Sequence, residues 1–362
     1  MRDPIVIPIT EVVTRWGEFN SILDARSPAE FEEDHLPGAM NTPVLDNAER
    51  AQVGLCHAQQ GAFEAKRMGA AIVARNIGML IAQHFAQQDR SWSPLVYCWR
   101  GGNRSGALAT VLARVGWRTH VLDGGYKAFR RWVIEDLERR VQTLRFVVVG
   151  GRTGSAKSRL LHRLRERGEQ VLDLEGLAVH RGSVLGSLPG SAQPSQKGFE
   201  TQIWDALRSL DPSRPVFVES ESRKVGRVQC PEGLIHRIRS ATVALIEADT
   251  GTRSHFLLAE YAHFRTDPAA FMALLDCLSP LHGHERVDLW KALIGADRWQ
   301  EVVIDLLEQH YDPSYDRSMK RNFMQLDRAP RITLVDTSEA ALDAACDALI
   351  RLAEPLAFPI SG

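Results

Sequence analysis

The chain has 362 residues, of which 44% are hydrophobic and 25% are charged, and its formal net charge is −1. This composition is typical of a globular protein, and the length predicts two domains rather than one core. No apolar run approaches the roughly 20 residues that cross a bilayer, and the Met1–Pro4 segment does not look like a secretion signal, so we expect a cytoplasmic protein with no membrane partner.

The first half of the chain alternates short apolar strands with helical stretches. Strands are expected at residues 21–24, 94–97 and 118–122. Helices are expected from the Ser27-Pro28 pair onward and at residues 61–88, 105–115 and 126–142. Strand and helix in alternation predict a parallel sheet covered on both faces, in a domain spanning residues 1–140.

Between the strand at 94–97 and the next helix lies the segment Cys98-Trp-Arg-Gly-Gly-Asn-Arg-Ser105. Gly101 and Gly102 allow the backbone to curl so that successive N–H groups point inward and form an anion-binding nest. The helix N-terminus, Arg100 and Arg104 add positive charge, which lowers a thiol pKa. We therefore expect Cys98 to be a reactive thiolate; the alternative is a buried cysteine at a strand end beside an ordinary loop.

The other cysteines give no second thiol motif. The five cysteines contain no CxxC pair and no histidine at metal-ligand spacing, so neither a disulfide framework nor a zinc site is predicted.

The sequence pattern of the second half of the chain also predicts an α/β domain. Strands are expected at residues 144–149, 170–174, 215–218, 242–247 and 332–335. Helices are expected at 157–167 and 338–352, with a helical insertion at roughly 254–310. This pattern predicts a mostly parallel sheet in a domain spanning residues 141–362.

A phosphate-binding loop is expected between the strand at 144–149 and the following helix. The segment Gly151-Arg-Thr-Gly-Ser-Ala-Lys-Ser158 resembles a Walker A loop, in which backbone N–H groups and a lysine hold phosphates. Its expected phosphate-binding residues are Gly151, Gly154, Ser155, Lys157 and Ser158. Ala156 replaces the usual glycine, which is tolerated if its backbone is near helical; the alternative for the whole segment is a plain tight turn.

The strand at 215–218 leads into Glu219, with Glu221 two residues later. Glu219 is a candidate metal ligand or base, since a carboxylate at this place can hold Mg²⁺ through water. It can equally cap a loop or pair with Arg223. No firmly bound metal or cofactor is predicted, and Mg²⁺ is retained only as an optional ligand.

Basic side chains are unevenly distributed. Ten arginines lie between residues 130 and 167, and a second cluster consists of Arg317, Lys320 and Arg321. These clusters are either solvated helix faces with i,i+4 ion pairs or surfaces that bind a polyanion.

The first domain resembles the rhodanese family over about residues 5–135. The resemblance rests on the Cys98 loop, on Ile22–Phe31 with His35–Ala39 upstream, and on Val121–Tyr126 downstream. It implies a cysteine that carries a chalcogen. The second arginine follows Cys98 by six positions rather than the usual five, which is similar to rhodanese-related phosphatases and implies a loop wide enough for a phosphate-bearing donor. Phosphatase activity is not favoured, because Tyr97 stands where those enzymes usually have histidine.

The pairing of the two domains resembles the tRNA 2-selenouridine synthase family over nearly the whole chain. The segments 173–183, 217–222 and 311–315 carry this likeness. The resemblance implies that a wobble 2-thiouridine in tRNA is S-geranylated from geranyl diphosphate and then receives selenium from selenophosphate. Cys98 would carry the selenium as a selanyl group, while Arg100, Gly101 and Arg104 hold the donor.

The family resemblance leaves other assignments as hypotheses. The phosphate loop is assigned to the diphosphate of geranyl diphosphate, and selenophosphate synthetase is an expected partner. The prenyl groove and the residues that contact the anticodon cannot be placed from the sequence. Two other functions remain open: an ATP-dependent rhodanese-type tRNA sulfurtransferase and a non-catalytic phosphate- or RNA-sensing module.

Overall fold

The computed structural model describes residues 3–182, 185–186, 190–324 and 326–354. The chain divides into two compact units, residues 1–139 with 194–205 and residues 140–193 with 206–362. The segment 194–205, which lies in the second half of the sequence, groups with the first unit. Within the described residues, no helix is long and apolar enough to cross a membrane.

Side chains of the segment 194–205 explain why it groups with the first unit. Trp204 is fully buried and donates a hydrogen bond from Nε1 to Asp136 at 2.9 Å. Its ring packs edge-on against Phe129. The Thr201 hydroxyl donates to Asp34 at 3.0 Å. Contacts over such long sequence separations cannot be read from local sequence patterns.

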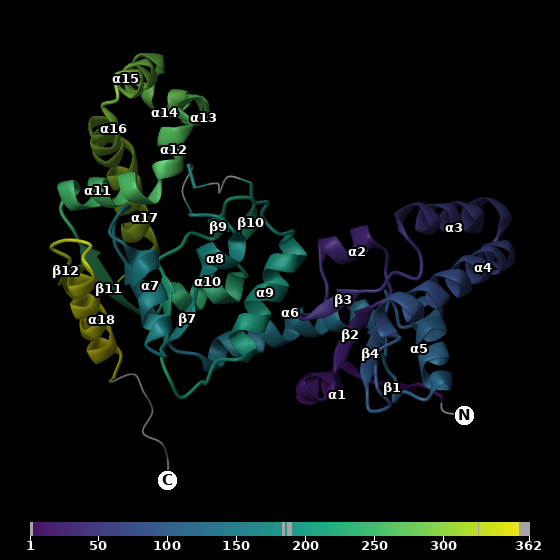
Figure 1. The fold of residues 1–362 in the computed structure, drawn as a ribbon. Helices are drawn as coiled ribbons and strands as arrows, with labels where there is room; N and C mark the ends of the chain where they lie inside the picture. The colour runs from purple at the N-terminus through teal and green to yellow at the C-terminus, as the bar shows by residue number, and fades with distance from the viewer. Residues whose placement is uncertain (1–2, 183–184, 187–189, 325, 355–362) are drawn as a thin grey trace, which may run out of the picture. The chain divides into compact units, whose positions relative to one another are not determined.

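The first unit contains a five-stranded parallel sheet with the strand order β1-β5-β4-β2-β3 (Figure 1). The strands are β1 (Ile5–Ile7), β2 (Ser21–Asp24), β3 (Ala39–Asn41), β4 (Pro94–Tyr97) and β5 (His120–Leu122). The strands predicted at 21–24 and 94–97 are confirmed residue for residue, and β5 is shorter than predicted. Strands β1 and β3 were not predicted.

Helices cover the first sheet. They are α1 (Ile9–Thr14), α2 (Pro28–Glu33), α3 (Asn47–Gln60), α4 (Ala62–Leu80), α5 (Asn103–Val115) and α6 (Gly125–Thr143). A short 3-10 turn, η1 (Trp16–Glu18), follows α1, and the π turn η2 (Ile81–Phe85) extends α4. Helices α3 and α4 lie side by side (Figure 1). The predicted 61–88 helix is confirmed as α4 with its π turn, whereas α3 was missed.

A buried polar network supports the C-terminal ends of the strands in this unit. The fully buried Arg26 donates to Asp24 at 2.6 Å and to the Asp34 carbonyl at 2.6 Å. Its guanidinium lies 4.1 Å from the centre of the Tyr126 ring, and the Tyr126 hydroxyl donates to the Asp34 carboxylate at 2.8 Å. The network therefore links the start of α6 to the ends of β2 and α2.

The second unit contains another five-stranded parallel sheet, with the order β12-β11-β6-β8-β7. The strands are β6 (Phe146–Gly150), β7 (Gln170–Leu172), β8 (Val216–Glu219), β11 (Thr242–Glu247) and β12 (Arg331–Thr333). A separate antiparallel pair joins β9 (Lys224–Val225) to β10 (Val228–Gln229). The predicted mixed α/β architecture with parallel sheets is confirmed in both units.

Helices α7 (Lys157–Glu166) and α18 (Glu339–Ala353) pack side by side on this sheet (Figure 1). Their apolar faces share one core cluster with the strands, which includes Val147, Leu160, Phe217, Ile246 and Leu349. The shorter helices of this unit are α8 (Leu174–Ala178) and α10 (Glu232–Arg239), whereas α9 (Gln196–Arg208) belongs to the first unit up to residue 205.

The predicted helical insertion is wider than residues 254–310. It starts with α11 (Thr250–Glu260) and ends with α17 (Asp312–Asn322). Between them lie α12 (Ala262–Thr266), α13 (Pro268–Leu275), η3 (Asp276–Leu278), α14 (Ser279–His282), α15 (His284–Gly295), α16 (Trp299–Leu306) and the π turn η4 (Leu307–Tyr311). A 3-10 turn, η5 (Leu326–Arg328), precedes β12. Aromatic side chains form a separate core in this region.

Candidate functional site

Cys98 lies directly after β4, at the C-terminal end of a central strand, and is only 3% exposed. The Ser105 hydroxyl donates to its Sγ at 3.1 Å. Burial raises the pKa of Cys98, but the Ser105 hydroxyl and the backbone N–H groups of Ser105, Arg100 and Gly102 outweigh burial and lower it below the ordinary value. These donors stabilise the negative charge, so the loop favours the thiolate, the nucleophilic form of cysteine.

The turn before α6 supports the back of the thiol loop. The N–H of Tyr126 donates to the carbonyl of Cys98 at 2.8 Å, and that of Lys127 donates to the carbonyl of Trp99 at 3.1 Å. Gly125 has a φ of +56°, and a Cβ added there would lie 2.2 Å from the Cys98 carbonyl oxygen. This close approach explains why a glycine-rich turn accompanies the thiol loop.

The two arginines of the loop have different environments. Arg100 is exposed. Arg104 donates to both carboxylate oxygens of Glu30, at 2.5 and 3.1 Å. Although burial raises the pKa of Glu30, this ion pair and hydrogen bonds from Ser27 lower it to about 2. Glu30 therefore compensates the charge of Arg104, and the sequence analysis did not identify this partner.

Trp99, next to the thiol, stacks on Tyr126 with a ring-centre distance of 5.4 Å and an interplanar angle of 28°. Trp99 is half-buried. One face of the indole is thus already used in packing against α6.

We expect Ser105→Ala to shift the ionisation of Cys98 to higher pH. A hydrogen bond to a charged group contributes about 1.5–3 kcal/mol, so its loss should raise the midpoint of thiol alkylation by roughly 1 pH unit. The measurement is the rate of iodoacetamide alkylation of Cys98 between pH 5 and 10, read by peptide mass spectrometry. An unchanged midpoint would show that the hydroxyl does not stabilise the thiolate.

The phosphate loop connects β6 to α7 in the second unit. Gly151 and Gly154 have φ values of 153° and 85°. Ala156 has a φ of 56° and a ψ of 25°, so its backbone is left-handed and the condition under which alanine replaces glycine without strain is not met. The chain has to reverse before entering α7, and this turn places a non-glycine residue in the left-handed region, at a cost of about 1–2 kcal/mol.

The polar groups of the phosphate loop bond within the loop and to a neighbouring carboxylate. The Lys157 ammonium donates to the Gly151 carbonyl at 2.6 Å, and burial lowers the pKa of Lys157. The Ser158 hydroxyl donates to Glu175 at 3.1 Å. The Ser155 hydroxyl is buried and has no hydrogen-bond partner among the described residues. A buried hydroxyl without a partner is what a loop that accepts a polar ligand would contain.

Carboxylates gather beside the loop at the ends of β7 and β8. Glu219 is 3% exposed, and its Oε1 accepts the N–H of Glu175 at 2.7 Å. Its Oε2 is buried without a hydrogen-bond partner in the described part of the chain. Burial, reinforced by the charges of Asp173 and Glu175, raises the pKa of Glu219 well above the ordinary value. Burial and Glu175 likewise raise the pKa of Glu221 to about 8.

The alternative in which Glu219 pairs with Arg223 is not what the structure shows. Arg223 instead pairs with Glu232 at 3.8 Å. Among the described residues, no group of three or more histidine, cysteine, aspartate or glutamate side chains is arranged to hold a metal ion.

Residues of α11 and α17 support the phosphate loop from the other side. The Tyr315 hydroxyl accepts the N–H of Gly151 at 2.6 Å and shares a hydrogen bond with Ser220 at 3.1 Å. Arg253 is 2% exposed, forms two hydrogen bonds with Asp312 at 2.7 and 2.8 Å, and donates to the Thr153 carbonyl at 3.2 Å. The 311–315 segment carries part of the family resemblance, whereas Arg253 was not among the site residues expected from the sequence.

We expect Asp312→Asn to destabilise this part of the second unit by about 3–5 kcal/mol, because it leaves the buried Arg253 charge unpaired. Asp316→Asn is the matched control, since Asp316 is 40% exposed and pairs with the half-exposed Arg152, so its loss should cost less than about 1 kcal/mol. Hydrogen exchange of the α11 and α17 amides in both variants measures the difference. Equal protection in the two variants would contradict the structural role of the buried pair.

The arginine-rich middle of the chain is largely neutralised. Arg163 on α7 and Arg167 just after it pair with Asp343 on α18, and Arg159 pairs with Glu260. These are ion-paired helix faces, but their partners come from other helices rather than from i,i+4 positions. In the second cluster, Lys320 lines a cavity of about 390 Å³ together with Arg152, Arg331 and the start of the phosphate loop.

Of the residues expected from the sequence, the structure brings Cys98, Arg100, Gly101, Gly102 and Arg104 together in one loop of the first unit. Likewise, it brings Gly151, Gly154, Ser155, Lys157, Ser158 and Glu219 together at the C-terminal edge of the second sheet. Ser183, the last residue of the family-like 173–183 segment, lies outside the described residues.

A parallel α/β unit with a cysteine nest, joined in one chain to a parallel α/β unit with a phosphate loop, defines a rhodanese–P-loop enzyme. Comparison with known families agrees: a rhodanese-like domain matches residues 10–131, and a tRNA 2-selenouridine synthase AAA domain matches residues 144–274. The chain belongs to the tRNA 2-selenouridine synthase family, as the sequence resemblance predicted.

Two tRNA 2-selenouridine synthases support this family assignment. The chain is 34% identical over 357 residues to tRNA 2-selenouridine synthase of Nitrosomonas europaea, covering 91% of each chain. It is 32% identical to the enzyme of the same name from Alcanivorax borkumensis, covering 83% of this chain and 90% of that one. Among solved structures, a rhodanese-related protein from Thermoplasma volcanium matches 36% of this chain and 92% of that one, at 17% identity and a TM-score of 0.24.

Proposed function

We propose that this enzyme replaces the sulfur of a wobble 2-thiouridine in tRNA by selenium, through an S-geranylated intermediate. Family membership over most of the chain supports the overall conversion. The single observation that carries the chemistry is the hydrogen-bonded sulfur of Cys98, which is held where its ionised form is stabilised. A second anion-binding loop in the same chain provides a place for a diphosphate leaving group.

In the first proposed step, the thiouridine sulfur attacks C1 of geranyl diphosphate. A carbon–sulfur bond forms, the bond from C1 to the diphosphate oxygen breaks, and the N3 proton of the base is lost. The backbone N–H groups of the phosphate loop, with Lys157 and Ser158, neutralise the leaving diphosphate, because fixed donors are most effective where charge develops. Lys157 would exchange its bond to the Gly151 carbonyl for one to the diphosphate.

The carboxylates beside the loop have two proposed roles. Glu221, whose pKa is raised to about 8, or its neighbour Glu219 would accept the N3 proton in its ionised form. Magnesium, when bound with the diphosphate, would supply further positive charge. The Ser158 hydroxyl and Glu219 Oε2, which has no hydrogen-bond partner among the described residues, suit a site that uses few protein ligands and completes its coordination with water and phosphate.

In the second proposed step, selenium replaces the geranylthio group. The Cys98 thiolate attacks the selenium of selenophosphate and a sulfur–selenium bond forms. The phosphorus–selenium bond breaks, and phosphorus takes its electron pair and leaves as phosphite, so phosphorus is the group that is reduced. The selanyl selenium then attacks C2 of the modified uridine, and geranylthiolate leaves. Two small-molecule thiols then reduce the sulfur–selenium bond and leave as their disulfide, which frees the selenouridine and returns Cys98 to the thiol.

The remaining residues of the thiol loop would bind the donor. Gly101 and Gly102 present backbone N–H groups, and Arg100 and Arg104 add guanidinium groups that suit the phosphate of selenophosphate. The tRNA phosphates would contact basic side chains such as Arg317, Lys320 and Arg321. Selenophosphate synthetase is proposed as the partner that supplies the donor.

The test incubates the protein with tRNA that carries wobble 2-thiouridine, geranyl diphosphate, selenophosphate and a thiol, followed by nucleoside mass spectrometry. We expect S-geranyl-2-thiouridine to appear first and 2-selenouridine to follow. Absence of both products would overturn the proposal. Consumption of ATP with thiosulfate as donor would instead assign a tRNA sulfurtransferase.

A further inference from the structure

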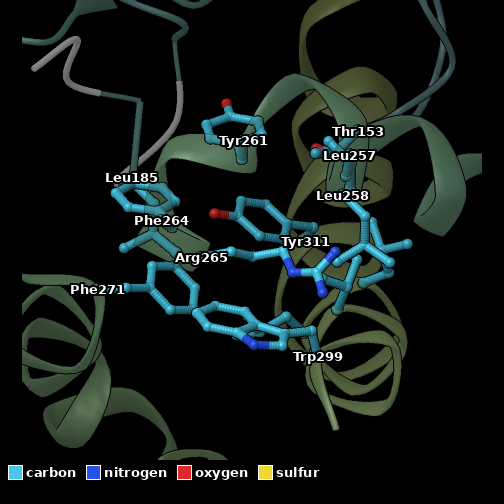
Figure 2. A pocket seen from close by; sticks show the side chains of 13 residues that line it. Thr153, Leu185, Leu257, Leu258, Tyr261, Phe264, Arg265, Phe271, Trp299 and Tyr311 are labelled. Atoms are coloured by element: carbon cyan, nitrogen blue, oxygen red, sulfur yellow. The ribbon is translucent and has the colours of Figure 1, made fainter. Parts of the chain in front are cut away.

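An apolar pocket lies among the helices of the second unit, next to the phosphate loop. Figure 2 shows its lining side chains, which come from α11, α12, α13 and α16 with neighbouring turns. Phe264 and Phe271 pack with ring centres 4.6 Å apart, and Phe271 and Trp299 with ring centres 5.7 Å apart. Together they form an aromatic wall.

The pocket and the phosphate loop share a wall. Thr153, a residue of the loop, lines the pocket beside Leu257 (Figure 2). A Cβ added to Gly154 would lie 3.1 Å from Leu257 Cδ1, so the loop backbone contacts this lining side chain directly. If the anionic group of a ligand binds in the loop, the group attached to it would therefore enter the pocket.

The lining of the pocket favours a hydrocarbon ligand over a polar one. Most of its side chains are aliphatic or aromatic, and among the described lining residues Arg265 is the only one with a full charge. The cavity has a volume of about 70 Å³. The chemistry of the lining, rather than its size, favours a hydrocarbon chain over a purine ring. A buried nucleobase would also need polar partners for its edges, since unpaired buried polar groups are costly.

We propose that this pocket binds the prenyl chain of the diphosphate substrate, with its aromatic wall at the far end of the chain. The inference rests on the proposed function and adds the subsite that the sequence did not reveal. It makes the second unit a receptor for a lipophilic diphosphate: the phosphate loop binds the head, and α11, α13 and α16 bind the tail. The depth of the pocket then limits the length of the chain that is accepted.

The test compares the binding of geranyl diphosphate and inorganic diphosphate by calorimetry in wild type and in Val303→Phe. Val303 lines the pocket and is only partly buried, so a phenyl group at this position would fill the cavity. We expect geranyl diphosphate to bind at least tenfold more weakly to the variant, roughly the cost of losing two buried methylene groups. Inorganic diphosphate should bind unchanged, which also shows that the phosphate loop is folded.

The matched control is Ile304→Phe, the next residue on α16, which is also partly buried but does not line the pocket. It should leave both affinities unchanged. Leu258→Ala provides a second variant with more room, and we expect it to improve the binding of farnesyl diphosphate relative to geranyl diphosphate.

The outcomes separate the pocket from the proposed function. If wild type binds geranyl diphosphate no better than inorganic diphosphate, the proposed function fails and this inference fails with it. If wild type prefers geranyl diphosphate but Val303→Phe and Leu258→Ala leave that preference and the chain-length selectivity intact, the proposed function stands and the pocket assignment is overturned. Loss of ATP binding in Val303→Phe, with geranyl diphosphate unaffected, would also overturn it.

Discussion

Replacing Cys98 with serine is expected to abolish selenium incorporation into tRNA while geranylation continues. A serine hydroxyl in the same loop does not ionise near neutral pH and cannot carry a selanyl group, although the backbone donors around it remain. Removal of a covalent nucleophile commonly lowers the reaction rate by roughly a thousandfold or more, so the amount of 2-selenouridine should fall below detection. S-geranyl-2-thiouridine should accumulate because its consumption is blocked.

Cys277→Ser is the control for this experiment, since Cys277 is an exposed thiol in the second unit. It should leave both products unchanged. Intact-protein mass spectrometry after incubation with selenophosphate should show one added selenium in wild type and none in Cys98→Ser. Selenouridine formation at a wild-type rate by Cys98→Ser would refute the assignment of Cys98.

The second large effect is expected for Lys157→Ala, which should lower the rate of geranylation by about a hundredfold to a thousandfold. The ammonium group lies in the phosphate loop, and the loss of a positioned donor to developing charge costs roughly this much. Burial lowers the pKa of Lys157, so a diphosphate in the loop would stabilise the charged form of its side chain. Liquid chromatography of the nucleosides over time measures the rate.

Lys291→Ala is the control for Lys157→Ala, because Lys291 lies in the same unit and forms a surface pair with Asp276. It should retain full geranylation. Equal loss of both steps in Cys98→Ser and Lys157→Ala would show that the two loops do not divide the reaction between them.

The sheets were predictable where strands are buried and central. Strands β2, β4 and β11 were predicted residue for residue, because each contains a buried apolar run and lies in the interior of its sheet. The strands β1 and β3 have three residues each and are largely exposed or half-buried, so their patterns carry little signal. The backbone conformation of Ala156 was not predictable from the sequence, because its left-handed φ and ψ are set by the turn through which the loop enters α7.

The thiol and phosphate loops were predictable because their residues are contiguous in the sequence. Their partners were not. Glu30 and Arg104 form an ion pair across 74 positions of sequence, and Asp312 and Arg253 form one across 59 positions. Such pairs form only when the fold brings distant helices together, and a single acidic or basic residue in a helix pattern gives no sign of its partner. The apolar pocket was hidden for the same reason, since its wall combines residues of several short helices.

The most direct test of two separate steps starts from tRNA that is already S-geranylated, supplied with selenophosphate and a thiol but no geranyl diphosphate. We predict that wild type and Lys157→Ala convert it to 2-selenouridine at similar rates, with release of geranylthiol, and that Cys98→Ser does not. If Lys157→Ala fails on this substrate, or if Cys98→Ser converts it, the thiolate at position 98 is not the group that delivers selenium independently of the phosphate loop.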